Sequence, residues 1–515
     1  HPVEVGHYYL LRSVHGVIVQ GTNQAPPMAA RESRPCGRRE GCRQAALPRP
    51  RGRPPAPKGL SKMSEPLGTS LPSLTTAIPG PASRELAQRL GRVESRNITR
   101  LEGEPPIFWT EARGANVRDA DGNVFVDLTS GFAVTATGHA NPHVAEAVGR
   151  QAATLAHAMG DVYPPEVKVR LLERLVAITP DPLGVCILGS AGSEAVEAAL
   201  KTAVMYTNRP GVIAFTGGYH GLTYGSLATT WRPDFRQPFR QQLFAGVRFA
   251  TYPNPYRAED PESVVAASLD GVRELIRAGD RTHTPIGAVL VEPMQGRGGL
   301  IVPPPGFLEG LRELCHEHEI VLIFDEIYTG FGRTGRWFAF QHSDVVPDIM
   351  TVGKGLTGML PLSAAIGTQE IMDAWPPSTG EAIHTSTFLG NPIACAAALA
   401  QIDEIESLGL VERAASLGRH LRERLEGWKR YPAVGDVRGL GLLQGVELVE
   451  DRDSRVPATA LAASVVQTAL QNGVLLLAEG PDANVLAFVP PMVISERQLD
   501  HALDTVEDAL AALGG

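Results

Sequence analysis

The chain has 515 residues, of which 43% are apolar and 20% are charged, and its formal net charge is −9. This length and apolar content are enough to bury a large core and to form two domains. No apolar run reaches the roughly 18 to 20 residues that a membrane-spanning helix needs, and the acidic balance argues against nucleic acid as a partner.

Residues 1–62 differ in composition from the rest of the chain. They contain 11 Lys and Arg against 3 Asp and Glu, so their net charge is +8. Since the whole chain has a net charge of −9, the remaining residues carry −17. Such a basic tail could bind nucleic acid or target an organelle, but it shows no amphipathic period. Because Met63 would serve as an ordinary start, we interpret residues 1–62 as translated upstream sequence or a disordered extension that continues to about residue 80. A transit peptide is the alternative.

The five cysteines are odd in number and show no pattern. Two lie in the extension, whereas Cys186, Cys315 and Cys395 lie in apolar contexts. They are typical of reduced core thiols in a cytoplasmic protein. The run His316-Glu317-His318 closes a predicted helix, and we interpret it as a solvated helix end, so no metal site is expected.

The body of the chain begins with a polar helical pattern over residues 81–101. Residues 116–128 then read as strand, turn and strand, with Asp121-Gly122-Asn123 at the turn, which predicts a β-hairpin. A glycine-rich segment at 131–142 follows and is a candidate for lining the substrate pocket.

A short strand at 185–188 leads into a glycine-rich turn and then a helical pattern. The free N–H groups of such a turn, together with the positive end of the helix dipole, can hold a phosphate group. Gly192 and Ser193 are therefore predicted to bind phosphate. The alternative is that the serine is an ordinary helix N-cap.

Two more buried strands are predicted, at 212–215 and 286–291, and each ends in a polar loop. The first delivers Tyr219 and His220; the second delivers Glu292, Gln295 and Arg297. A helix and the strand ending at 324 follow, and right-handed strand–helix–strand crossovers predict a parallel sheet. His220 is either a partner that supports the site or a hydrogen-bonded core histidine.

The stretch 321–364 organises the prediction. Asp325 follows a β-branched apolar run that should be buried on both faces of a parallel sheet, where ligands bind at the carboxyl ends of strands. Lys354 stands 29 residues later between Gly353 and Gly355. A carboxylate facing a pyridine nitrogen and a lysine facing an aldehyde form the recurring site for pyridoxal phosphate. A simple core ion pair between the two residues is the alternative.

The glycines at 330, 332 and 335 also match the dinucleotide-binding fingerprint. We reject this reading because no clear helix start follows them. The position about 20 residues on holds Lys354, where an acidic residue is needed.

The same stretch resembles the signature of the class III, or ω-amino acid, aminotransferases, the family of the 4-aminobutyrate, ornithine and acetylornithine enzymes. The resemblance covers residues from about 81 to the carboxyl terminus. It rests on the words Phe324-Asp325-Glu326, Thr329-Gly330-Phe331-Gly332-Arg333-Thr334-Gly335, Pro347-Asp348, Gly353-Lys354 and Pro361-Leu362-Ser363-Ala364. It implies the α/β fold of fold type I pyridoxal phosphate enzymes, with a mostly parallel sheet in a large domain at 131–385. Residues 81–130 and 386–515 would build a small α+β domain.

The resemblance also assigns roles to residues. Tyr219 would stack on the cofactor ring, and Gln295 would hydrogen-bond its phenolic oxygen. His220 and Glu292 complete the expected cofactor-binding set. Thr387 would reach the phosphate of a neighbouring site, which implies a homodimer with shared active sites.

The activity implied is ping-pong transfer of an amino group from an ω-amino acid or related amine to 2-oxoglutarate or pyruvate. In it Lys354 moves the proton, and Asp325 keeps the ring nitrogen protonated. A racemase, epimerase or decarboxylase on the same scaffold is the alternative, and a binding protein without turnover is disfavoured by the presence of both residues.

Three positions depart from the 4-aminobutyrate enzymes. Leu222 replaces an Arg that binds the distal carboxylate of the donor. Arg297 replaces a Glu, and Ala487 replaces the Arg with which that Glu pairs. We expect these changes to leave one positive charge in place of a pair, so that Arg297 binds the substrate carboxylate; a solvated loop residue is the alternative.

Overall fold

The computed structural model describes residues 67–98 and 106–514. All of these residues belong to the unit 64–515, and the predictions for residues 1–62 lie outside the described part. Residues 67–80 do not continue a disordered extension as expected. Ser73 forms a β-bridge with Val124, and the backbone N–H of Gly68 donates to the side chain of Asn116.

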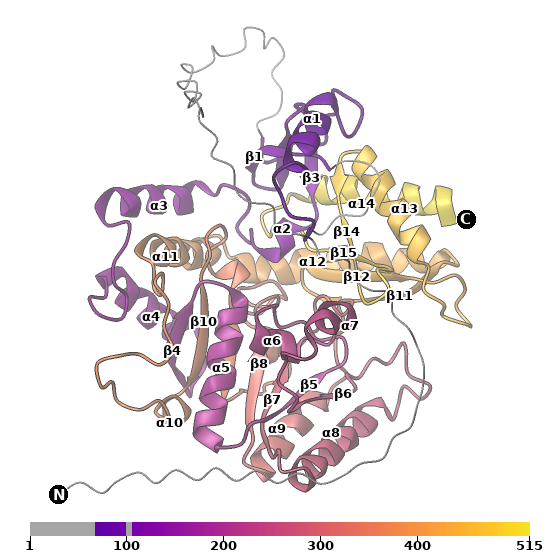
Figure 1. Cartoon of the computed structure of the whole chain (residues 1–515). Coiled ribbons are helices and arrows are strands. Elements are labelled where there is room, and N and C mark those ends of the chain that lie inside the picture. Colours follow the sequence, from indigo (N-terminus) through magenta and orange to yellow (C-terminus); the bar gives the residue numbers. More distant parts are fainter. Residues whose placement is uncertain (1–66, 99–105, 515) are drawn as a thin grey trace, which may run out of the picture. The chain divides into compact units, whose positions relative to one another are not determined.

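A seven-stranded sheet forms the centre of the described unit (Figure 1). Strands β6, β5, β7, β8 and β9 are parallel neighbours, whereas β10 is antiparallel to both β9 and β4. The mostly parallel sheet predicted from the sequence is confirmed. In spatial order the strands are β4 (Leu183–Gly189), β10 (Ser363–Thr368), β9 (Ile349–Val352), β8 (Val321–Asp325), β7 (Ile286–Val291), β5 (Gly211–Phe215) and β6 (Val247–Ala250).

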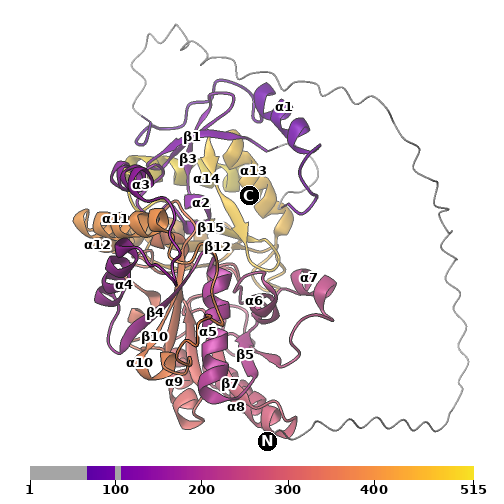
Figure 2. The same ribbon diagram turned by 60° about the vertical axis from the view of Figure 1, so that its left-hand side comes forward.

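Both faces of this sheet are buried, because successive side chains of a strand point to opposite sides. In β7, Ala288 and Leu290 join a cluster with helix α5 (Gly192–Thr207), which runs alongside the strands in Figures 1 and 2. Val289 and Val291 join the main cluster with helices α8 (Val264–Arg281) and α9 (Phe307–Glu317). The uninterrupted apolar runs of the sequence are explained by this two-sided burial.

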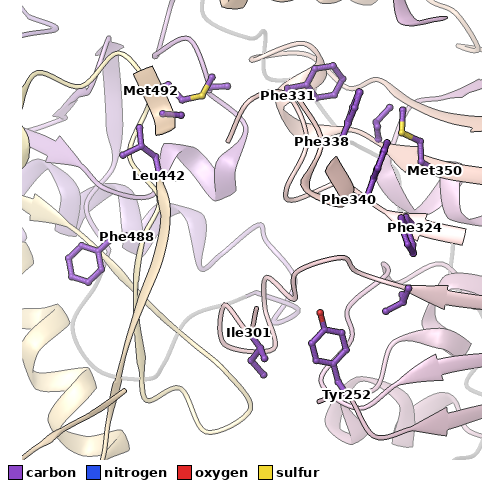
Figure 3. Packing of buried hydrophobic residues seen from close by; sticks show 14 of the residues in the cluster. Tyr252, Ile301, Phe324, Phe331, Phe338, Phe340, Met350, Leu442, Phe488 and Met492 are labelled. Atoms are coloured by element: carbon purple, nitrogen blue, oxygen red, sulfur yellow. The ribbon is translucent and has the colours of Figure 1, made fainter. Parts of the chain in front are cut away.

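Aromatic rings fix the segment that follows β8. The ring centroids of Phe324 and Phe340 are 6.1 Å apart, and Phe340 stacks on Phe338 with ring centroids 5.8 Å apart. Figure 3 shows these three rings. Phe331 packs edge-on against Phe338. This packing holds the glycine-rich segment against the end of the strand that carries Asp325.

Two smaller sheets join segments far apart in sequence. The hairpin predicted at 116–128 is present, formed by β2 (Asn116–Asp119) and β3 (Val124–Asp127), and β13 (Val474–Leu475) pairs in parallel with β3. The first small sheet has the order β1-β2-β3-β13 with β1 at Trp109–Arg113; the second has the order β11-β12-β15-β14, with strands Val434–Leu440, Leu443–Leu448, Val485–Phe488 and Leu477–Glu479. The domain boundaries proposed from the sequence remain predictions.

Helices cover the sheets and connect their strands. The helix expected at 81–101 ends earlier, at Leu90, where Gly91 follows. None of the helices in the described part is both long enough and apolar enough to cross a membrane. The other helices are α1 (Pro81–Leu90), α2 (Ser130–Ala133), α3 (Pro142–Thr154), α4 (Glu166–Ile178), α6 (Tyr224–Thr229), α7 (Pro233–Arg236), α10 (Gln369–Met372), α11 (Pro392–Ser407), α12 (Leu410–Glu426), α13 (Thr459–Gln471) and α14 (Glu496–Gly514).

Candidate active site

A cavity of about 310 Å³ lies among the residues that follow the carboxyl ends of the central strands. Each of the strands β4, β5, β7, β8 and β9 delivers at least one lining residue, as expected for an open parallel sheet. The lining residues are Ala191, Gly192, Ser193, Tyr219, His220, Gly221, Leu222, Glu292, Arg297, Asp325, Ile327, Tyr328 and Lys354. Lys354 and Asp325 therefore face the same cavity.

Lys354 stands two residues beyond β9 in a strained conformation. Its φ is 38°, in the left-handed region that residues with a Cβ rarely adopt. Burial lowers the pKa of its amine below the ordinary value of 10.5, while the carboxylates of Asp325 and Glu292 oppose this shift. The environment thus favours the neutral amine, the form that attacks a carbonyl carbon.

Asp325 ends β8, and both of its carboxylate oxygens are hydrogen-bonded. Nδ1 of His220 lies 2.7 Å from Oδ2. Oδ1 accepts from the backbone N–H of Ile327 at 3.1 Å and from the hydroxyl of Thr351 at 3.2 Å. His220 is 3% exposed, and among the described residues its Nε2 has no hydrogen-bond partner. These contacts fix the carboxylate at the wall of the cavity.

Glu292 joins two of the loops that line the cavity. Its carboxylate accepts from the backbone N–H groups of Tyr219 at 3.0 Å and Gly296 at 2.9 Å. Burial raises the pKa of Glu292 to about 7, with a further rise from Asp325 and an opposing effect of His220. The residue holds the Tyr219 loop in place through these backbone contacts.

The amino-terminal end of α5 opens on the cavity, as predicted for a phosphate site. Ala191 is the N-cap and makes no side-chain cap hydrogen bond, so the reading of this serine segment as an ordinary N-cap is wrong. A Cβ at Gly192 would lie 2.8 Å from Cδ1 of Ile327, and one at Gly221 would lie 2.5 Å from Cβ of Ser193. Gly221, with φ at 118°, therefore has no room for a side chain, and a side chain at residue 192 would have to displace Ile327.

Arg297 also faces the cavity, but it is paired, which the sequence did not suggest. Its Nε lies 3.6 Å from Oε2 of Glu479, at the end of β14, and its guanidinium lies 4.8 Å from the ring centre of Tyr219. Burial raises the pKa of Glu479, while Arg297 opposes the rise. The expectation of one unpaired positive charge is wrong: the partner comes from β14 rather than from position 487.

The structure does not bring Gln295 to this cavity. Its side chain lines a neighbouring cavity of about 300 Å³, where Nε2 donates to the carbonyl oxygen of Thr216 at 2.8 Å. A Cβ at Gly217 or Gly298 would lie 2.6 or 2.5 Å from its Oε1. The amide is thus held between two glycines, and Gln295 is absent from the lining of the cavity that contains Lys354.

Thr387 is exposed and lies in the segment between α10 and α11, outside the cavity lining.

Tyr328, which the sequence analysis missed, does line the cavity, and Nζ of Lys354 lies 4.8 Å from its ring centre. Its position three residues after Asp325, in the loop that follows β8, could have predicted that it lines the cavity. Glu479 had no local signal, because its contact with Arg297 depends on the pairing of distant segments.

These groups fit pyridoxal phosphate. Lys354 offers an amine to the aldehyde, Asp325 a carboxylate to the pyridine nitrogen, and the start of α5 a cradle for the phosphate. The Asp325 carboxylate has only His220 and Thr351 as side-chain hydrogen-bond partners in the part of the chain that the structure describes, which leaves it available to a ring cation. The same part contains no cluster of three or more His, Cys, Asp or Glu side chains able to hold a metal ion.

Comparisons with known proteins agree with this geometry. The family model for class III aminotransferases matches residues 98–510. A probable 4-aminobutyrate aminotransferase of Bacillus subtilis is 38% identical over 413 residues, which cover 78% of this chain and 92% of that protein. An alanine/serine racemase of Pyrococcus horikoshii is 34% identical over 448 residues, 85% of this chain and 92% of that protein.

Solved structures show the same relationship. A thermostable (S)-enantioselective omega-transaminase from Thermomicrobium roseum superposes with a TM-score of 0.78 at 29% identity, covering 84% of this chain and 99% of that one. With most of its length matched by the family model, the chain belongs to the class III aminotransferases and is a pyridoxal phosphate-dependent transaminase.

Proposed function

We propose that this aminotransferase moves an amino group from an ω-amino acid or related amine, such as a 4-aminobutyrate-like donor, to 2-oxoglutarate or pyruvate. The observation that carries the proposal is the joint placement of Lys354 and Asp325 on one cavity. Two groups that must grasp opposite edges of one small heterocycle have to share a cavity, and these two do.

In this proposal Lys354 and Asp325 have separate roles. Bound pyridoxal phosphate supplies the electron sink. Lys354 would hold the cofactor through its amine and, once displaced by a donor amine, would act as the base that takes the proton from the donor carbon and the acid that returns it on the cofactor side. Asp325, held by His220, keeps a proton on the ring nitrogen.

The other lining residues orient and enclose the cofactor. Tyr219 supplies a flat apolar face that excludes water, and its position is set by the backbone contact to Glu292. Gly192 and Ser193 hold the phosphate at the start of α5.

Arg297 is proposed to bind the substrate carboxylate. The 3.6 Å ion pair with Glu479 is longer than a charge-assisted hydrogen bond, and among the described residues Nε of Arg297 has no hydrogen-bond partner. A guanidinium at the cavity wall whose existing ion pair is long can take a carboxylate in a bidentate contact. The exposed Leu222 on the rim offers no charge to a distal carboxylate.

We also propose a cytoplasmic homodimer. Thr387 is exposed beside Phe388 and Ile383, whose exposed fractions are 60% and 65%, so this segment is available to contact a second copy. Cys186, Cys315 and Cys395 are free thiols, as in a reducing compartment.

A donor screen on the purified holoenzyme tests the function. Each amine is added alone while the absorbance of the cofactor is followed, and each keto acid is then tested for restoring the original spectrum. Recovery of a new amino acid from the keto acid is expected. Interconversion of amino acid enantiomers without any keto acid would instead favour racemisation.

A further inference from the structure

Tyr328 lies beside Lys354 without any role in the function proposed above. It follows Asp325 by three residues and lines the same cavity. The ring centre is 4.8 Å from Nζ of Lys354, which is the geometry of a cation–π contact. A Cβ at Gly296 would lie 2.8 Å from Cγ and Cδ1 of Tyr328, so the ring packs closely against the backbone of Gly296. The orientation of the ring is therefore set by the loop after β7.

The charges around Lys354 make this ring contact significant. Burial disfavours the ammonium form, and Arg297 repels it, whereas Asp325, Glu292 and Glu479 attract it. Asp325 is held by His220 and Glu292 by backbone N–H groups, while Glu479 is paired with Arg297. The face of an aromatic ring attracts a cation without requiring a further charge or hydrogen bond.

The hydroxyl of Tyr328 has no part in this attraction. Burial raises the pKa of the phenol well above 10, with Glu479 and Glu292 adding to the rise and Arg333 and Arg297 opposing it. Burial therefore favours the neutral phenol, and the contact with Lys354 is made by the face of the ring.

We propose that Tyr328 is a positioning residue that receives the amine of Lys354 after the donor has displaced it, and that holds the resulting ammonium group over its ring between the two proton transfers. The inference rests on the proposed role of Lys354. In the first transfer the proton leaves the donor carbon for Nζ, and the electron pair of the C–H bond stays with the cofactor. In the second, Nζ returns the same proton to the carbon on the cofactor side, so no oxidant or reductant is needed.

Replacement of Tyr328 by Phe and by Leu separates the ring from the hydroxyl. Tyr328→Phe should keep kcat within about 3-fold of the parent enzyme. Tyr328→Leu should lower kcat about 10-fold with KM for the donor nearly unchanged, because cation–π contacts, from exposed to desolvated ones, correspond to roughly 2- to 30-fold in an equilibrium constant. Tyr328→Met serves as a second variant without a ring if Leu does not fold.

A second readout does not depend on turnover. Holoenzyme supplied with donor but no keto acid carries a free Lys354, whose rate of reductive methylation is followed against pH by peptide mapping. The midpoint should fall by about one pH unit in Tyr328→Leu and stay constant in Tyr328→Phe. The inference would be overturned if the parent and Tyr328→Leu had equal methylation midpoints and equal kcat. It would also be overturned if Tyr328→Phe and Tyr328→Leu lowered kcat by the same factor. Activity remaining in Lys354→Ala would instead refute the proposed function itself.

Discussion

Glu479→Gln should strengthen keto acid binding, because it releases Arg297. The two groups are 3.6 Å apart, a distance at which the Coulomb attraction is about 4 to 5 kcal/mol at an effective dielectric constant of 20. The Arg297 side chain is 28% exposed, so water screens the pair and we take about 1 to 2 kcal/mol as the part that an entering carboxylate must overcome. The substitution removes the charge of Glu479 and nearly preserves the shape of its side chain, so KM for the keto acid should fall about 10-fold.

Steady-state kinetics at saturating donor, with 2-oxoglutarate and pyruvate in turn, provide the assay. Arg297→Ala should raise KM about 100-fold, because it removes the guanidinium and leaves the buried carboxylate of Glu479 without its partner. Asp482→Asn is the matched control, since it removes an exposed carboxylate from the same segment. An unchanged or raised KM in Glu479→Gln would refute the reasoning.

Three further predictions concern the cofactor and pH. Lys354→Ala should lose turnover by at least about 1,000-fold while retaining its fold, as kinetics and circular dichroism would show. Gly192→Ala should weaken cofactor affinity about 10-fold in titrations of the cofactor-free protein, because the added Cβ would lie 2.8 Å from Cδ1 of Ile327. The control Gly149→Ala should leave the affinity unchanged, because a Cβ at residue 149 has no atom within 4 Å. Glu292 has its pKa raised to about 7 from 4.5, so the folded state keeps its proton to higher pH than the unfolded state does, and stability falls by about 3 kcal/mol as pH rises through this window. Glu292→Gln should flatten the decline of Tm between pH 5 and pH 8, and parallel curves would contradict the assignment.

Local patterns located the strand ends and their loops. The apolar runs before Asp325 and Glu292 are buried on both faces, as their composition indicated. The glycine-rich turn before α5 lies at the cavity, because a short turn after a buried strand has only one edge of the sheet at which to emerge. These features depend on neighbours in sequence, and sequence reasoning was sufficient for them.

The directions of the side chains in the loop after β7 did not follow from the sequence. Gln295 and Arg297 stand in the same loop, yet only Arg297 faces Lys354, because the glycines at 217 and 298 leave room for the amide on the far side. The sequence of the loop alone does not show this choice, because it also depends on Thr216 and Gly217, which follow β5 and lie against the amide of Gln295.

By itself, the amino-acid sequence determined the family, the parallel sheet and the identity of the amine and the carboxylate that face one another across the cavity. Only the tertiary structure decided that His220 fixes Asp325, that Glu479 neutralises Arg297, and that the ring of Tyr328 lies beside Lys354. The physical reason is that charge pairing and ring contact act through space over a few ångströms. Whether residues far apart in sequence meet at that distance is determined by the packing of the whole chain.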